Sequence, residues 1–170
     1  MTAIRTWIVR GLTATAVAAC MTVLLTGVTQ AYDRGHCVQI FGNDANVASV
    51  VQFSMDGGGA DFGDEPHWFG APVGTAVVCF ATSGRIAVKG RLYADRSQRA
   101  IVQIRFRRTN GTFSPTVQRT VDTLPNQGLA SAEIAVASPT GQFNRVRIRL
   151  FTRDFTTGVT ARVATRTFNR

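Results

Sequence analysis

The stretch that decides the fold is Arg145-Val146-Arg147-Ile148-Arg149-Leu150, in which arginine alternates with an aliphatic residue. Successive side chains of a β-strand point to opposite faces, so a period of two places the aliphatic residues on one face and the arginines on the other. The same period recurs in Val102-Gln103-Ile104-Arg105-Phe106-Arg107. We therefore expect strands that are buried on one side and exposed on the other.

Strand-like runs fill most of the chain after residue 46. They cover residues 47–53, 76–81, 85–94, 102–107, 116–122, 129–137, 145–153 and 159–164. Turn residues separate them, and Asn110-Gly111 is expected in a type I′ hairpin because both central residues favour positive φ. No stretch has a helical period. The sequence predicts an all-β, single-domain antiparallel β-sandwich of about eight strands, Ig-like or jelly-roll-like.

Residues 1–31 are typical of a secretory signal peptide. Arg5 and Arg10 precede an uncharged stretch over 12–28, and Thr29-Gln30-Ala31 resembles a cleavage site. An uncleaved anchor and a lipoprotein acylated at Cys20 stay open as alternatives. With cleavage after Ala31, residues 32–170 would form the secreted sandwich domain, and no membrane span would remain.

Two cysteines come after the predicted signal, Cys37 and Cys79. An even pair in an exported protein favours a disulfide. Because the bridge would close a long loop, the chain-entropy model predicts a stabilisation of about 4 kcal/mol.

The charge is strongly basic, with 19 Lys and Arg against 10 Asp and Glu, and Lys89 is the only lysine. Residues two apart share a strand face, so the arginines should form outward rows. The predicted anion-binding residues are Arg105, Arg107, Arg145, Arg147, Arg149, Arg153 and Arg162. Further rows are Arg85 with Lys89 and Arg91, and Arg162 with Arg166, and all would share one face if their strands lie in one sheet.

Arginine offers planar, bidentate donors that suit phosphate, sulfate and carboxylate. The predicted function is therefore that of a secreted, non-enzymatic binding protein at the cell surface. Its ligand would be an anionic polymer, namely a cell-wall polymer, an acidic polysaccharide or a nucleic acid. A merely solvated polar face is the alternative interpretation.

A glycine-rich acidic stretch over 56–70 is expected to form a long loop. Its candidate site residues are Asp61, Asp64, Glu65, His67 and Trp68. Oxygen ligands in 56–65 would suit Ca²⁺, although their order does not match an EF-hand. Two alternative functions use this loop: a secreted effector or inhibitor that binds a protein partner, and a hydrolase.

Catalytic motifs are missing from the sequence. The two histidines are His36 and His67, and the sequence contains no G-x-S-x-G, H-E-x-x-H or P-loop pattern. We therefore expect no catalytic residues, no metal ligands and no cofactor.

Three segments carry a family resemblance: Gly90-Arg91-Leu92-Tyr93-Ala94-Asp95, Asn110-Gly111, and residues 144–150. Together with the use of arginine in place of lysine, they resemble small exported β-sandwich proteins of actinobacteria, an uncharacterised group. The resemblance implies export and a sandwich fold, and it transfers no active site. Those proteins often have further cysteines in their second half, where this chain has none.

Overall fold

The computed structural model describes residues 35, 37–41, 47–63 and 76–170. The chain divides into two compact units, Met1–Tyr32 and Asp33–Arg170, and every described residue belongs to the second. The predicted signal peptide over 1–31 lies outside the described residues. Among the residues that are described, no helix combines the length and the apolar character needed to cross a membrane.

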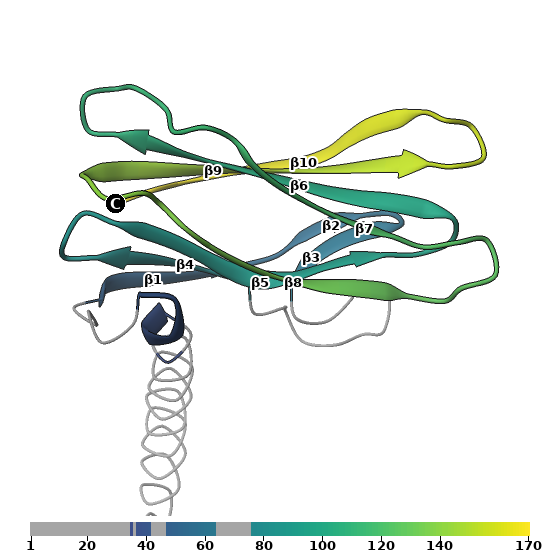
Figure 1. Ribbon diagram of the computed structural model, residues 1–170, viewed down its shortest axis with the longest axis horizontal. Helices are drawn as coiled ribbons and strands as arrows, with labels where there is room; N and C mark the ends of the chain where they lie inside the picture. Colours follow the sequence, from purple (N-terminus) through teal and green to yellow (C-terminus); the bar gives the residue numbers. More distant parts are fainter. Residues whose placement is uncertain (1–34, 36, 42–46, 64–75) are drawn as a thin grey trace, which may run out of the picture. The chain divides into compact units, whose positions relative to one another are not determined.

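Ten strands run through the described residues and form two antiparallel sheets, which Figure 1 shows as two stacked layers. The all-β sandwich is therefore confirmed. The strands are β1 (Val47–Phe53), β2 (Met55–Gly57), β3 (Ala60–Gly63), β4 (Ala76–Ala81), β5 (Ile86–Ala94), β6 (Gln98–Arg108), β7 (Val117–Asp122), β8 (Ala130–Ala137), β9 (Phe143–Asp154) and β10 (Thr160–Asn169).

The first layer is a six-stranded sheet built around β5. One edge of β5 pairs with β4 through residues 86–89 and with β3 through residues 91–94, and its other edge pairs with β8. Gly90 lies where these two partners meet, and a Cβ there would come within 2.9 Å of the Ala76 Cβ. Only glycine leaves room for this close approach.

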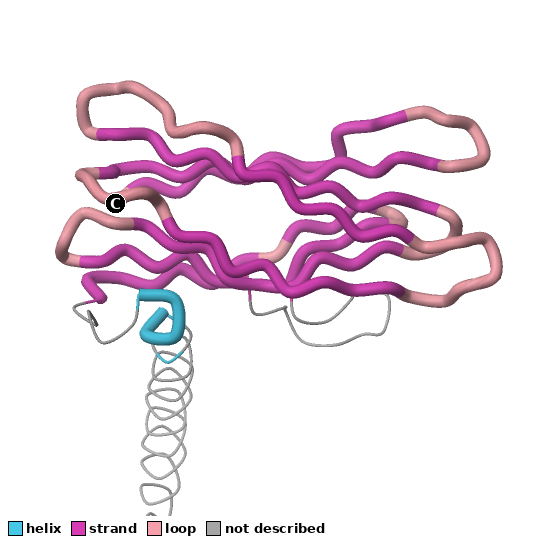
Figure 2. The backbone as a smooth tube through the Cα atoms, in the orientation of Figure 1, coloured by secondary structure: helices cyan, strands magenta, loops and turns pink. Residues whose placement is uncertain are grey.

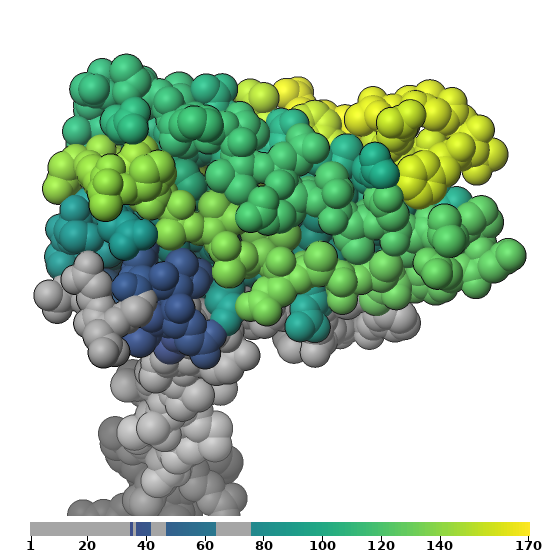
Figure 3. All heavy atoms as spheres, viewed as in Figure 1, coloured from purple at the N-terminus to yellow at the C-terminus, as the bar shows by residue number. Residues whose placement is uncertain are grey.

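The second layer is a four-stranded sheet in the order β10-β9-β6-β7. Its inner face follows the predicted period of two, because alternate residues of β6 and β9 are fully buried. These are Ala100, Val102, Ile104 and Phe106 on β6, and Val146, Ile148 and Leu150 on β9. They pack against Phe62, Val88 and Leu92 of the other sheet. Figure 2 shows the two layers edge-on, and Figure 3 shows side chains filling the space between them.

A second, smaller core covers the outer face of the six-stranded sheet. Residues 37–41 form a short helix, and Cys37 and Phe41 pack on Val77 and Ala87. The predicted disulfide is confirmed, since Cys37 and Cys79 are bonded, with Cα atoms 5.6 Å apart. Such a bond is compatible with an extracellular protein.

Two local predictions are wrong. The expected loop over 56–70 begins as a hairpin, because β2 and β3 pair through Asp56↔Asp61 and turn at Gly58, whose φ is +63°. The Asn110-Gly111 turn is not type I′, since only Gly111 has a positive φ. The Asn110 side chain instead accepts a hydrogen bond from the Thr112 amide.

Candidate anion-binding face

The outer face of the four-stranded sheet carries all seven of the arginines predicted to bind anions. Register pairs Arg105 with Arg147 and Arg107 with Arg145, so these side chains leave the same face. Arg149 and Arg153 share the parity of Arg147, and Arg162 lies opposite Phe151, which also has that parity. We call these seven residues the arginine face, and they lie on β6, β9 and β10.

Like charges meet directly across the central strand pair of this sheet. The opposed pairs are Arg99↔Arg153, Arg105↔Arg147 and Arg107↔Arg145. Directly opposed like charges destabilise a sheet, each by a few tenths to about 1 kcal/mol. The arrangement therefore does not arise from the needs of strand pairing.

Few acids are available to neutralise the arginine face. The four acids after residue 85 are engaged elsewhere: Asp95 with Arg96, Asp122 with Arg99, Glu133 with Lys89, and Asp154 with the turn amides of Thr156 and Thr157. None of the seven arginines forms an ion pair with a described residue. The face thus keeps its positive charge.

Arg99 differs from its neighbours because it has a carboxylate partner. Its Nε and Nη2 atoms donate to the two Asp122 carboxylate oxygens at 2.7 and 2.6 Å. The Arg99 hydrogen bond holds the pKa of Asp122 below its usual value, and the same bond raises the pKa of Arg99. This fork–fork pair closes one end of the arginine face.

Phe113 supports two of the arginines. The guanidinium carbons of Arg105 and Arg147 lie 4.8 and 5.4 Å from the centre of its ring. The ring's negative π-face favours both cations, so one side chain offsets part of the repulsion between an opposed pair. Both arginines are half-buried, and neither has an acidic partner among the described residues.

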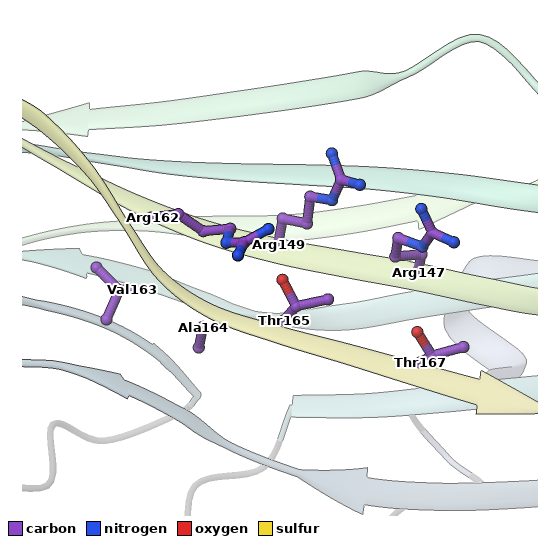
Figure 4. A pocket seen from close by; sticks show the side chains of 7 residues that line it. All are labelled: Arg147, Arg149, Arg162, Val163, Ala164, Thr165 and Thr167. Atoms are coloured by element: carbon purple, nitrogen blue, oxygen red, sulfur yellow. The ribbon is translucent and has the colours of Figure 1, made fainter.

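A shallow, open depression lies over the paired strands β9 and β10 on the arginine face, with a volume of about 540 Å³, and we call it the groove. Its lining is Arg147, Arg149, Arg162, Val163, Ala164, Thr165 and Thr167. Figure 4 shows the three guanidinium groups and the two threonine hydroxyls projecting on the same side of the sheet. Thr165 lies beside Arg149 and Thr167 beside Arg147 in the strand register.

A β-bulge in β10 creates this combination. The register shifts between Arg162 and Ala164, so that Thr165 and Thr167 share the outer face with Arg162. The same shift places Arg166 opposite the buried Ile148, and its predicted alignment with Arg162 is wrong. A bulge adds one residue to a strand, and the side chains beyond it therefore point to the opposite face from the one their parity predicts.

The other predicted basic row does not join the arginine face. Lys89 and Arg91 are on β5, which belongs to the six-stranded sheet. Their shared face there is the one covered in part by the helix at 37–41, which packs on Ala87. The condition that all rows lie in one sheet is therefore not met for these residues.

The predicted loop site is only partly described. Asp61 lies in β3 with 1% of its surface exposed, and its Oδ1 accepts a hydrogen bond from the Phe62 amide. Asp64, Glu65, His67 and Trp68 lie outside the described residues, as does His36. In the described part of the chain, no group of three metal-ligating side chains comes together.

Sequence reasoning missed Phe113, Thr165, Thr167 and the Arg99–Asp122 pair. Cross-strand register alone brings Arg99 opposite Asp122, and the sequence carries no signal for that register. The sequence pattern places the two threonines on the wrong face, because the bulge reverses the face of the residues that follow it. Only Phe113 had a signal in the sequence, because it is an aromatic residue shortly after the turn that follows the basic strand β6.

No family model and no curated protein matches the chain.

Proposed function

We propose that this protein is a secreted, non-enzymatic binding module that holds an anionic polymer on its arginine face. A cell-wall polymer, an acidic polysaccharide or a nucleic acid has the required charge density. The observation that carries the proposal is the gathering of seven arginines, without acidic partners among the described residues, on one face of one sheet.

The proposed mechanism is electrostatic. Each guanidinium makes charge-assisted hydrogen bonds to an anionic group, and counterions leave the dense polyanion as the contacts form. The face is a flat sheet surface rather than a deep pocket, which suits a long ligand that lies across several strands. Export enters as part of the proposal from the signal-like residues 1–31 and from the Cys37–Cys79 bond.

The test compares two triple variants of equal charge change. R105Q/R147Q/R149Q removes charge from the arginine face, and the control R91Q/R119Q/R166Q removes three exposed arginines that lie off it. Binding to duplex DNA and to heparin is measured across a salt series. For duplex DNA, each lost phosphate contact should flatten the slope of log K against log salt by about 0.9.

We therefore expect a loss of up to about 2.7 in that slope for the face variant and little change for the control. Equal losses for both variants would show that net charge alone drives binding. Retention without any salt dependence would contradict the electrostatic mechanism.

A further inference from the structure

The groove between β9 and β10 is chemically richer than the rest of the arginine face. It combines three guanidinium groups with two neutral hydroxyl donors, Thr165 and Thr167. Neither hydroxyl has a hydrogen-bond partner among the described residues, and no acid lines the groove. Three guanidinium groups and two hydroxyls can all donate hydrogen bonds, and this set suits a ligand rich in acceptor oxygens.

We propose that this groove binds successive phosphate groups of a phosphodiester chain. The inference rests on the proposed function and narrows it to one ligand class. Arginine matches the non-bridging phosphate oxygens with a planar fork. Threonine hydroxyls are regular partners of phosphate oxygens in nucleic-acid complexes. The groove therefore supplies both kinds of donor that a chain of phosphates uses.

The spacing of the arginines supports a repeating ligand. Arg147 and Arg149 are two residues apart on β9, which separates their origins by about 6.8 Å. Arg162 lies opposite Phe151, which is a further two residues along the same strand. Measured along the strand direction, the positions from which these three arginines arise thus succeed one another at a nearly constant interval.

A phosphodiester chain has a similar interval. An extended polypeptide, which has three backbone bonds per residue, spans about 3.3–3.6 Å per residue. By the same geometry, six bonds between neighbouring phosphorus atoms, as in glycerol or sugar phosphodiesters, span about 7 Å. Each phosphate can then meet one arginine without bending the chain.

The residues that line the groove also indicate which part of the ligand it recognises. The groove has no aromatic ring among its seven lining residues, so bases or sugars have no stacking platform inside it. Contacts with phosphates position a ligand without reading its side groups. We infer that the groove recognises the backbone and tolerates different side groups.

The test uses three probes of equal charge number: an abasic twelve-unit phosphodiester oligomer, an oligo-glutamate and a heparin fragment. The intact protein, with its disulfide formed, should bind the abasic oligomer several-fold more tightly than either other probe at the same salt. T165V/T167V keeps the shape and strand preference of both side chains while removing the hydroxyls. It should weaken oligomer binding about five- to tenfold and weaken oligo-glutamate binding by a smaller factor.

The matched control is T120V/T160V, which removes two outer-face hydroxyls outside the groove lining and should change neither affinity. A second pair compares R147K/R149K with R107K/R145K, which keep charge but lose the guanidinium fork. Only the first should reduce the preference for phosphodiester.

The possible failures are distinguishable. Equal binding of all three probes would overturn the groove proposal and leave the anionic-polymer function standing. Tighter binding of heparin would assign the groove to sulfated chains and also overturn it. Binding of no probe would remove both proposals together. These comparisons use the unmodified protein, so they do not depend on whether a variant folds.

Discussion

Arg149 provides a direct test of whether the arginine face is uncompensated, because the charged residues around it are all positive and it lacks an acidic partner among the described residues. Arg147 precedes it by two residues, Arg105 lies diagonally across on β6, and Arg162 lines the same groove. We expect Arg149→Gln to stabilise the folded protein at low salt. Arg149→Lys keeps the charge and should not.

The magnitude is set by spacings of about 7 Å along and across the strands. Two unit charges at that distance repel by about 0.6 kcal/mol in water. Screening leaves about 0.5 kcal/mol per pair at 10 mM salt, about 0.25 at 0.15 M and less than 0.1 at 1 M. Part of the repulsion with Arg147 persists in the unfolded chain. The net gain for Arg149→Gln is therefore about 1 kcal/mol at 10 mM salt and near zero at 1 M.

The assay is urea unfolding of the wild type and variants at 10 mM, 0.15 M and 1 M NaCl. The salt dependence is the informative quantity, because lost side-chain packing changes the free energy of unfolding equally at all three salt concentrations. Arg99→Gln, which breaks the pair with Asp122, is the internal control and should destabilise most at low salt. If Arg149→Gln behaves like Arg99→Gln, the arginine face has hidden acidic partners and the reasoning fails.

Three further predictions concern the scaffold. The pKa of Asp122 is lowered in the folded state, so the ionised carboxylate stabilises the fold above the ordinary aspartate pKa. This stabilisation is lost as pH falls through the lower folded value. In urea titrations, Asp122→Asn should therefore be less stable than the wild type at pH 6, and the two free energies of unfolding should converge near pH 2. Replacing both Cys37 and Cys79 by alanine should cost about 4 kcal/mol, and an unchanged unfolding midpoint would contradict the loop-closure account. Gly90→Ala should destabilise by about 1–3 kcal/mol through overpacking, measured by thermal unfolding, whereas Gly128→Ala, with open space around it, should be nearly neutral.

Much of the fold could be predicted because β6 and β9 are buried on one face only, while β4 is apolar throughout and buried on both faces. The ranges 47–53 and 76–81 were predicted to the residue, and the runs around 102–107 and 145–153 fall inside longer strands. An alternating pattern in which only one parity is apolar gives both the strand and the direction of its side chains. For the same reason the outward placement of Arg105 and Arg147 was predictable.

The features that the sequence hid depend on contacts between distant segments. Asp56 and Asp61 read as loop residues because glycines surround them, yet β3 gains its place by pairing with β5. The bulge after Arg162 has no marker in the local sequence, and it decides which β10 residues face the groove. Assignment of Lys89 to the other sheet depends on tertiary pairing, which a period of two cannot specify.

The buried apolar residues of β6 and β9 explain why the fold can tolerate the arginine face on the other side of the sheet. A one-residue slip of β6 against β9 would turn every apolar residue outward and bury arginines instead. Val102, Ile104, Ile148 and Leu150, all fully buried, therefore fix the register without help from the outer side. The register therefore does not constrain which residues occupy the outer positions. A pair of like charges there, such as Arg105 opposite Arg147, lowers the stability of the fold. Three opposed arginine pairs in one register, one of them offset by the Arg99–Asp122 pair, are accordingly not a folding requirement, and the polyanion that we propose as ligand would relieve the repulsion that the free protein retains.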